Sequence, residues 1–329
     1  MKRKPEISVI VLTYNQAQTI ARTLDSILAQ QCNFPYEIVV SDDSPDDSTR
    51  RVIEQYAKAF PSVVRLLPKH ENFGVVRNYF YALSQCKGDL IADCAGDDYW
   101  YGFGSLQKKR DIMVANPDAA LVHSDWLRVD INDYNSNLIP SDPSGGLMKY
   151  RRDYADGREL LPMVLAADSE PLIHISTALY RRDIITQALK LNPSMIENPE
   201  WQCEDLPVTA ALLASGRGVR WIPDTTLVYS IGGNTISSPA RLSRSALFYA
   251  QAAVMTLNLA RHYGIPSRIV AKSINAKMRF AMNQAIASGD KSVIDNLRSI
   301  IVENNIRRPI VDRLKEAIKL LINKRNLNC

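Results

Sequence analysis

The strongest constraint on the fold is a regular alternation of β-branched and amphipathic segments over about the first 125 residues. Residues 7–12 form a short apolar run typical of a buried strand, and residues 17–30 carry apolar side chains at helical spacing. The pattern repeats, with further strands expected at 36–40, 63–67, 89–92 and 119–123 and further helices at 47–60, 75–84 and 105–115. Short links between such elements predict an α/β fold, with a mostly parallel central sheet and helices on both faces.

The second part of the chain is less regular and then becomes helical. Residues 132–146 are rich in Asn, Ser, Pro, Asp and Gly, which indicates a long loop. Further strands are expected at 175–180, 218–222 and 226–229, and helices at 205–215, 239–262, 267–288, 290–303 and 309–323. We therefore expect an α/β domain over residues 1–237 and a C-terminal helical region over 238–329.

Composition narrows the class of protein. The chain has 329 residues with 46% apolar and 23% charged side chains, which is ordinary for a globular protein. It contains no run of about 18 apolar residues, so no membrane span is expected. The five cysteines form no CxxC pair, and the first apolar segment is too short for a signal peptide. These features favour a cytoplasmic protein with reduced thiols.

Charge is distributed unevenly along the chain. Residues 231–329 contain 16 Lys and Arg against 5 Asp and Glu, a balance of +11, whereas the first 230 residues carry a balance of −6. The acidic part suits cation chemistry, and the basic part suits an anionic surface. Residues 310–324 have an apolar stripe flanked by basic side chains, which fits either a helix on the cytoplasmic face of a membrane or a helix packed on its neighbour. No nucleic-acid-binding motif is present, and the sequence leaves homo-oligomerisation open.

Acidic pairs follow two of the predicted strands. Asp42 and Asp43 come after the second strand, and Asp97 and Asp98 come after the fourth. The carboxyl ends of parallel strands meet at one edge of a sheet, where such folds bind ligands. Neighbouring carboxylates repel each other unless a divalent cation or hydrogen-bond donors neutralise them, and oxygen ligands suit Mg²⁺ or Mn²⁺. The alternative for the first pair is simple helix capping.

Four segments together resemble the family 2 glycosyltransferases of GT-A fold. The segments are residues 7–15, Asp42-Asp43-Ser44, His70-Glu71-Asn72-Phe73-Gly74 with Arg77-Asn78, and Gly96-Asp97-Asp98-Tyr99-Trp100. Their order and spacing match from residue 7 to about 125, and a weaker match continues to about 237. The resemblance implies a Rossmann-like GT-A sheet, a nucleotide-sugar donor and a Mn²⁺ or Mg²⁺ cofactor.

The resemblance also implies a role for each matching residue at the donor site. Leu12, Thr13 and Tyr14 would line the nucleotide base. Asp43, with Asp42 beside it, would accept a hydrogen bond from a uracil N–H. The remaining roles are Arg77 near the base or diphosphate, Asp97 on the ribose and Asp98 on the metal ion.

A third acidic pair is the one that, by the resemblance, supplies the proton acceptor. Family members place such a pair at the start of a helix, and here Glu204 and Asp205 match, followed by Pro207 in the first helical turn. Asp205 would be the general base, and Glu204 would orient the donor or acceptor. The alternative is an acidic pair favoured only by the helix dipole. One base and one metal-bound leaving group imply an inverting displacement.

The chain departs from the family pattern at two positions. Many relatives have a carboxylate where this chain has Ala95, and many have a metal-binding histidine after the last strand, where this chain has no histidine and Asn234 is a candidate helper. Three further residues are expected at the acceptor side: Trp100, Trp201 and His174. The alternatives are core packing for both tryptophans and a structural histidine.

The sequence thus favours a metal-dependent inverting glycosyltransferase. It would move a sugar, from a UDP-sugar in particular, to a hydroxyl of a bacterial surface glycan (O-antigen or capsule-like) or of a polyprenyl-diphosphate-linked glycolipid. The alternatives are a nucleotidylyltransferase and a non-catalytic nucleotide- or polyanion-binding protein. The first would need a Gly-rich basic loop after the first strand, which Thr13-Tyr14-Asn15-Gln16 is not. Dehydrogenase and P-loop fingerprints are absent.

Overall fold

The computed structural model describes residues 3–133, 136–168, 170–198, 201, 203–232, 241–310, 312–313, 315–316 and 319. The chain divides into two compact units. The first comprises Met1–Val164, Pro171–Pro199 and Cys203–Ile231, and the second comprises Leu165–Glu170, Glu200–Gln202 and Gly232–Cys329. The domain boundary expected at 237/238 lies outside the described residues.

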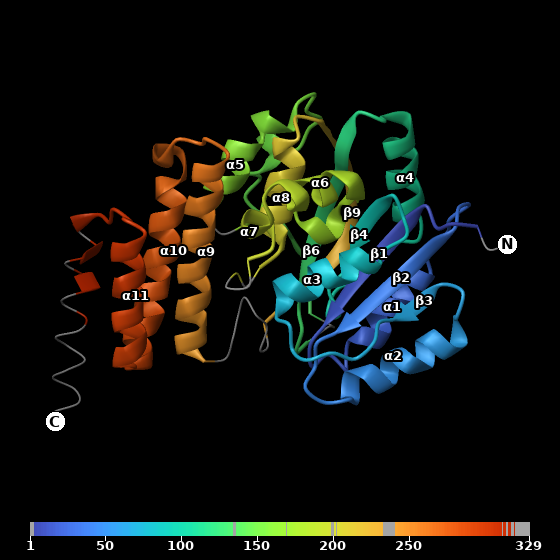
Figure 1. The fold of residues 1–329 in the computed structure, drawn as a ribbon, viewed down its shortest axis with the longest axis horizontal. Helices are drawn as coiled ribbons and strands as arrows, with labels where there is room; N and C mark the ends of the chain where they lie inside the picture. The colour runs from blue at the N-terminus through green and yellow to red at the C-terminus, as the bar shows by residue number, and fades with distance from the viewer. Residues whose placement is uncertain are drawn as a thin grey trace. The chain divides into compact units, whose positions relative to one another are not determined.

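The first unit is built on one sheet, shown in Figure 1. Its strand order is β3-β2-β1-β4-β8-β6-β9-β5, with β7 paired to β6. The run β3-β2-β1-β4 is parallel, β8 is antiparallel to both β4 and β6, and β6 is parallel to β9. The strands are β1 (Ile7–Thr13), β2 (Tyr36–Asp42), β3 (Val64–Leu66), β4 (Leu90–Asp93), β5 (Tyr99–Trp100), β6 (Ala119–Asp130), β7 (Ile139–Pro140), β8 (Leu179–Arg181) and β9 (Gly218–Ile231).

Helices surround this sheet, so the predicted mostly parallel α/β fold is confirmed. In Figure 1, α3 lies in front of β1 and β2, and it packs on both strands. The central strands are buried on both faces, which explains why they read as continuous apolar runs in the sequence. The helices up to residue 214 are α1 (Ile20–Leu28), α2 (Ser48–Ala59), α3 (Val75–Gln85), α4 (Ser105–Ala115), α5 (Leu161–Ala166), α6 (Arg182–Leu191), α7 (Pro193–Ile196) and α8 (Asp205–Ala214).

The second unit is helical, as predicted. Its helices α9 (Leu242–His262), α10 (Ser267–Ser288) and α11 (Lys291–Glu303) pack side by side (Figure 1). Gly289 ends α10 in the left-handed conformation, where glycine is favoured. The helix expected at 309–323 falls largely outside the described residues. No helix within the described part of the chain combines the length and apolar character that a membrane span requires.

The structure adds β5, β7, α5, α6 and α7, which were not predicted, and extends β6 to Asp130. Two of the predicted segments also take another form. Residues 175–177 form a 3₁₀ turn rather than the start of a strand, because the His174 carbonyl accepts hydrogen bonds from both the N–H and the hydroxyl of Thr177. The two strands expected at 218–222 and 226–229 form one strand, β9, which pairs with β6 through a register shift at Ile222 to Thr225. Pro223 lacks an N–H, which explains why the ladder is irregular there.

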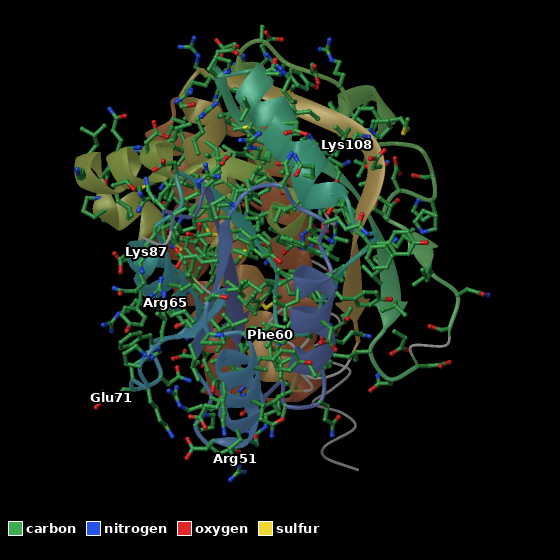
Figure 2. The ribbon with its side chains drawn as sticks, turned by 90° about the vertical axis from the view of Figure 1, so that its right-hand side faces the viewer. Arg51, Phe60, Arg65, Glu71, Lys87 and Lys108 are labelled. Carbon is green, nitrogen blue, oxygen red and sulfur yellow. The ribbon has the colours of Figure 1, made fainter. Side chains whose placement is uncertain are left out.

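The amino ends of the strands are closed by a structural network around Glu37. Its buried carboxylate accepts hydrogen bonds from the Ser8 hydroxyl (2.7 Å), the Lys87 N–H (2.7 Å) and Arg65 (3.1 Å). Figure 2 labels Arg65 and Lys87 near each other on this side of the molecule. The Glu37 carboxylate is therefore used in internal hydrogen bonds.

Candidate active site

Asp42 joins the ends of β1 and β2. Its Oδ1 atom accepts hydrogen bonds from the Thr13 hydroxyl (2.8 Å) and the Ser44 hydroxyl (2.6 Å). The side chains of Asp42 and Thr13 are both buried. Both residues thus stabilise the turn after β2 rather than present free polar groups at the surface.

Asp43 holds the loop that precedes α3. Its two carboxylate oxygens accept the N–H groups of Phe73 (2.8 Å) and Gly74 (2.9 Å), and His70 stacks on Phe73 with ring centroids 4.0 Å apart. Burial raises the pKa of Asp43, and the two N–H hydrogen bonds oppose that shift. The carboxylate predicted to contact the base therefore fixes the shape of the 70–74 loop, whose residue Glu71 is labelled in Figure 2.

Two predicted donor-site residues remain exposed beside this loop. Tyr14 is 46% exposed and comes directly after β1, whereas Leu12 is partly buried within the strand. The Arg77 side chain is exposed, and its guanidinium lies 5.0 Å from the centroid of the Phe73 ring. Tyr14 and Arg77 thus offer an aromatic ring and a cation at the end of β1, on the same side as Asp43.

The turn that carries Asp97 and Asp98 lies against the end of β1. The Gly96 N–H donates to the Leu12 carbonyl (3.0 Å), and the α1 hydroxyls of Thr19 and Thr23 donate to the carbonyls of Gly96 (2.8 Å) and Asp98 (2.6 Å). A side chain at Gly96 would place Cβ 2.5 Å from Gln16 Oε1 and 2.6 Å from Thr13 Cγ2. Glycine is therefore required for this close approach.

Gly96→Ala is expected to destabilise the protein by about 1–3 kcal/mol, because the added methyl group overpacks the contact with β1. It should also weaken nucleotide binding, since the acidic turn must move. Urea denaturation and calorimetry with UDP would measure both effects. Gly104→Ala is the matched control, because nothing lies within 4 Å of its added Cβ. Equal stability of the two variants would contradict the tight fit inferred at Gly96.

Asp98 has the most constrained carboxyl group at this edge. Its side chain is 1% exposed, and its Oδ1 accepts the Ser230 N–H (2.8 Å). Its Oδ2 is buried and has no hydrogen-bond partner among the residues that the structure describes. Burial, reinforced by the charge of neighbouring Asp97, raises the pKa of Asp98 well above its usual range. Burial also raises the pKa of Asp97, against the opposing effects of Gln16 and Arg22.

Arg22 and Ser230 are site residues that the sequence reasoning missed. Arg22 donates to the Asp97 carbonyl (2.9 Å) and lies over the Tyr99 ring at 4.2 Å, and the Ser230 hydroxyl donates to the same carbonyl (2.6 Å). Arg22 comes from α1 and Ser230 from β9, so their meeting depends on the fold. The only signal for Ser230 was its place in the segment after the last strand, where relatives have a histidine.

Glu204 and Asp205 stand at the start of α8, with Asp205 as the first helical residue. Burial raises the pKa of both groups, that of Asp205 to about 6, and the charge of Asp205 raises that of Glu204 further. The Asp205 charge also contributes to the raised pKa of Asp98. The acidic pair of α8 and the acidic turn after β4 therefore lie within electrostatic range, although more than 100 residues separate them in sequence.

The three residues expected at the acceptor side are buried. Trp100 belongs to the hydrophobic core of the sheet, which is the packing role that the sequence left open. Trp201 is also buried and is grouped with the second unit. His174 lies between Trp126 and Tyr229, with centroid distances of 5.3 and 4.9 Å, and burial lowers its pKa to about 4. His174 is therefore neutral at physiological pH.

Few protein side chains at this edge of the sheet are available to bind a metal ion. Among the described residues, no three His, Cys, Asp or Glu side chains are grouped so as to hold a metal ion by themselves. Asn234, the candidate helper, lies outside the described residues. The unpartnered Asp98 Oδ2 beside Asp97 is nevertheless the kind of buried oxygen that a divalent cation satisfies.

Comparison with known proteins identifies the family. Residues 8–188, more than half of the chain, match the sequence model of glycosyl transferase family 2. The chain belongs to this family. This family 2 chain is 34% identical over 115 residues to an uncharacterized protein of Mycobacterium tuberculosis, a match that covers 35% of the chain and 33% of that protein. The chain thus spans about a third of that relative's length.

Two solved structures share the GT-A architecture of this family 2 chain. S. aureus TarS 1–349 in complex with UDP-GlcNAc superimposes with a TM-score of 0.56 at 19% identity, covering 91% of this chain and 89% of that one. The mannosyltransferase PcManGT from Pyrobaculum calidifontis, in complex with GDP-Man and Mn²⁺, gives a TM-score of 0.55 at 18% identity, covering 98% and 88%. At these identities the likeness establishes the fold, and the GT-A prediction is confirmed.

Proposed function

We propose that this chain transfers a sugar from a nucleotide-sugar donor to an acceptor hydroxyl with inversion of configuration. The observation that carries the proposal is that one compact unit holds both a buried acidic turn after β4 and an acidic helix start at α8. Asp98 has a buried oxygen with no hydrogen-bond partner among the described residues, and Asp205 stands at a helix start with a pKa close to neutral. A leaving-group site and a proton acceptor are the two elements that such a displacement requires.

The acidic turn after β4 fits a divalent cation. Asp98 would hold it through Oδ2, with Asp97 beside it, and donor phosphate oxygens and water would complete the coordination. Mn²⁺ or Mg²⁺ bound there would offset the charge that develops on the leaving diphosphate. Arg22, which already contacts the Asp97 carbonyl, adds a fixed positive charge next to the turn.

Asp205 is the group proposed to accept the proton of the acceptor hydroxyl. A pKa near 6 leaves it ionised at neutral pH yet basic enough for proton transfer. Glu204, whose pKa burial and the Asp205 charge raise above its usual range, would orient donor or acceptor hydroxyls by hydrogen bonding. The raised pKa of both groups favours general acid–base chemistry over a purely capping role at the start of α8.

The nucleotide is proposed to lie over the ends of β1 and β2. Tyr14 and Arg77 are exposed there, and Asp43 keeps the intervening loop in place. UDP is the proposed nucleotide, since the TarS structure carries UDP-GlcNAc and Asp43 resembles a uracil-binding aspartate. The GDP-Man complex of PcManGT makes a guanine donor the first alternative to test.

The acceptor is proposed to be a hydroxyl of a glycan or of a polyprenyl-diphosphate-linked glycolipid in surface-polysaccharide synthesis. The surplus of basic residues after position 230 supports an acceptor that carries phosphates or sits at an anionic membrane surface. A soluble glycan acceptor would leave that surplus without a function.

A thermal-shift screen would test the proposed donor class. UDP-, GDP- and dTDP-sugars should be compared with ATP, each with and without Mn²⁺. One nucleotide sugar at about 100 times its Kd should stabilise the protein by about 2.7 kcal/mol, seen as a rise in Tm that requires Mn²⁺. A rise with ATP alone would favour a nucleotidylyltransferase, and no rise with any nucleotide would contradict the proposed donor site.

A further inference from the structure

Asp93 is a buried carboxyl in the middle of the sheet that the proposed reaction does not use directly. It is the last residue of β4 and is paired with Ile10 of β1. Its Oδ2 accepts the Tyr180 hydroxyl at 2.6 Å, and the Tyr180 and Tyr79 hydroxyl oxygens are 2.5 Å apart. Because Tyr180 gives its hydrogen to Asp93, Tyr79 must donate to Tyr180. The three side chains therefore form a directed chain from Tyr79 to Asp93.

The second carboxyl oxygen of Asp93 has no hydrogen-bond partner within the described part of the chain. Oδ1 is buried, and the Asp93 side chain as a whole is 7% exposed. An ionised carboxylate with a single donor is strongly disfavoured at such a site, whereas the protonated form carries no net charge. Burial raises the pKa of Asp93 to about 8, against the opposing effect of the Tyr180 hydrogen bond. Asp93 is thus neutral at pH 7.

The surroundings of Asp93 are acidic. The charge of Asp205 raises the pKa of Asp93, and the charge of Asp93 raises the pKa of Glu204, which stands just before α8. No cation contributes to its pKa shift. The titratable groups that face Asp93 are Tyr180 on β8, Tyr79 on α3, Cys86 after α3, Cys94 after β4, and Glu204 and Asp205 on α8.

We propose that Asp93 is a positioning residue which stays protonated beside the Glu204–Asp205 pair and thereby leaves Asp205 as the carboxylate that ionises. The proposal rests on the function proposed above and deepens it. A charged Asp93 would disfavour ionisation of Asp205 by like-charge repulsion and would repel the donor diphosphate. The tyrosine chain fixes Oδ2 in place, so Oδ1 carries the proton.

Infrared spectroscopy would detect this proton without any substrate. A protonated carboxyl has a C=O stretch that a carboxylate lacks, and the wild-type minus Asp93→Asn difference spectrum isolates the Asp93 contribution. Asparagine keeps an acceptor for the Tyr180 hydroxyl and the same side-chain volume. The carboxyl band should be present at pH 7 and should disappear as the pH rises through about 8. Its absence at pH 7 would overturn the proposal.

The pH dependence of sugar transfer would test the consequence for the site. Wild-type kcat/KM should fall by up to about tenfold as the pH rises through about 8 and Asp93 ionises, as expected for an interaction of about one pKa unit, and Asp93→Asn should lack this fall. Tyr180→Phe removes the hydrogen bond that favours the ionised form, so its fall should begin at higher pH.

The experiments distinguish failure of the positioning role of Asp93 from failure of the proposed function. The same alkaline fall in all three proteins would overturn the positioning role. If the infrared band is found but the wild type transfers no sugar from any nucleotide donor, the proposed function fails while the protonated Asp93 stands.

Discussion

Asp205→Asn is expected to lower kcat about 10²- to 10⁴-fold, which is the usual contribution of a general base. Asparagine has the size of aspartate but cannot take the proton of the acceptor hydroxyl. Wild-type kcat/KM should rise with pH through about 6, because Asp205 must lose its proton to act, and the variant should lack this rise. Steady-state kinetics from pH 5 to 8 would measure both effects.

A measurement of donor binding distinguishes a variant that has lost only its general base from one whose donor site is disrupted. The Kd of UDP with Mn²⁺, measured by calorimetry, should change by less than about threefold in Asp205→Asn, because the base contacts the acceptor. Glu204→Gln is the matched variant: it changes the neighbouring carboxyl but leaves Asp205 in place, so it should retain the rise near pH 6. A variant of Asp205 that turns over normally, or that no longer binds UDP, would be inconsistent with a base at this position.

Asp98→Ala is expected to abolish transfer and to weaken UDP binding in the presence of Mn²⁺ by at least about 100-fold. The substitution removes the buried oxygen proposed to ligate the cation. It should lower stability by only about 1–3 kcal/mol, because the buried Ser230 N–H loses its acceptor, and the protein should stay folded. Calorimetry with UDP, at fixed Mn²⁺ and in EDTA, would measure the loss.

Asp224→Ala is the matched control for Asp98→Ala. Asp224 also lies in the first unit, but it is exposed and pairs with Lys108, which Figure 2 labels at the surface. Loss of this exposed ion pair should change neither binding nor transfer appreciably. If Asp98→Ala bound UDP and Mn²⁺ as well as Asp224→Ala does, the metal-site assignment would be wrong.

The sequence pattern predicted the helices and strands whose formation depends on residues close together in the chain. The strands and helices from residue 7 to 115 were predictable because parallel central strands are apolar throughout and the helices between them are amphipathic. The turn at 175–177 was not, because its apolar residues fit a strand and only the contacts of His174 with Thr177 select the turn. The length of β6 follows from pairing with β9, about 100 residues away.

The candidate site also contains residues that the local sequence indicates and residues that only the fold brings there. Asp98 and Asp43 could be found because each follows a predicted strand at the binding edge of the sheet. Asp93 could not be found in this way. A polar residue at a strand end does not indicate that it will be buried and will accept a hydrogen bond from Tyr180, 87 residues later. Arg22 similarly reads as one polar residue on a helix surface, and only the fold brings it to Asp97.

The central claim is that acidic residues distant in sequence surround one cation-bound diphosphate. A crystal structure with UDP and Mn²⁺, with anomalous data collected at the manganese edge, would test it most directly. We predict one manganese peak within coordination distance of Asp98 and the UDP diphosphate, with Asp205 on the side from which an acceptor would approach. A manganese and diphosphate site remote from Asp98, or one with Asp205 facing away from it, would contradict the account.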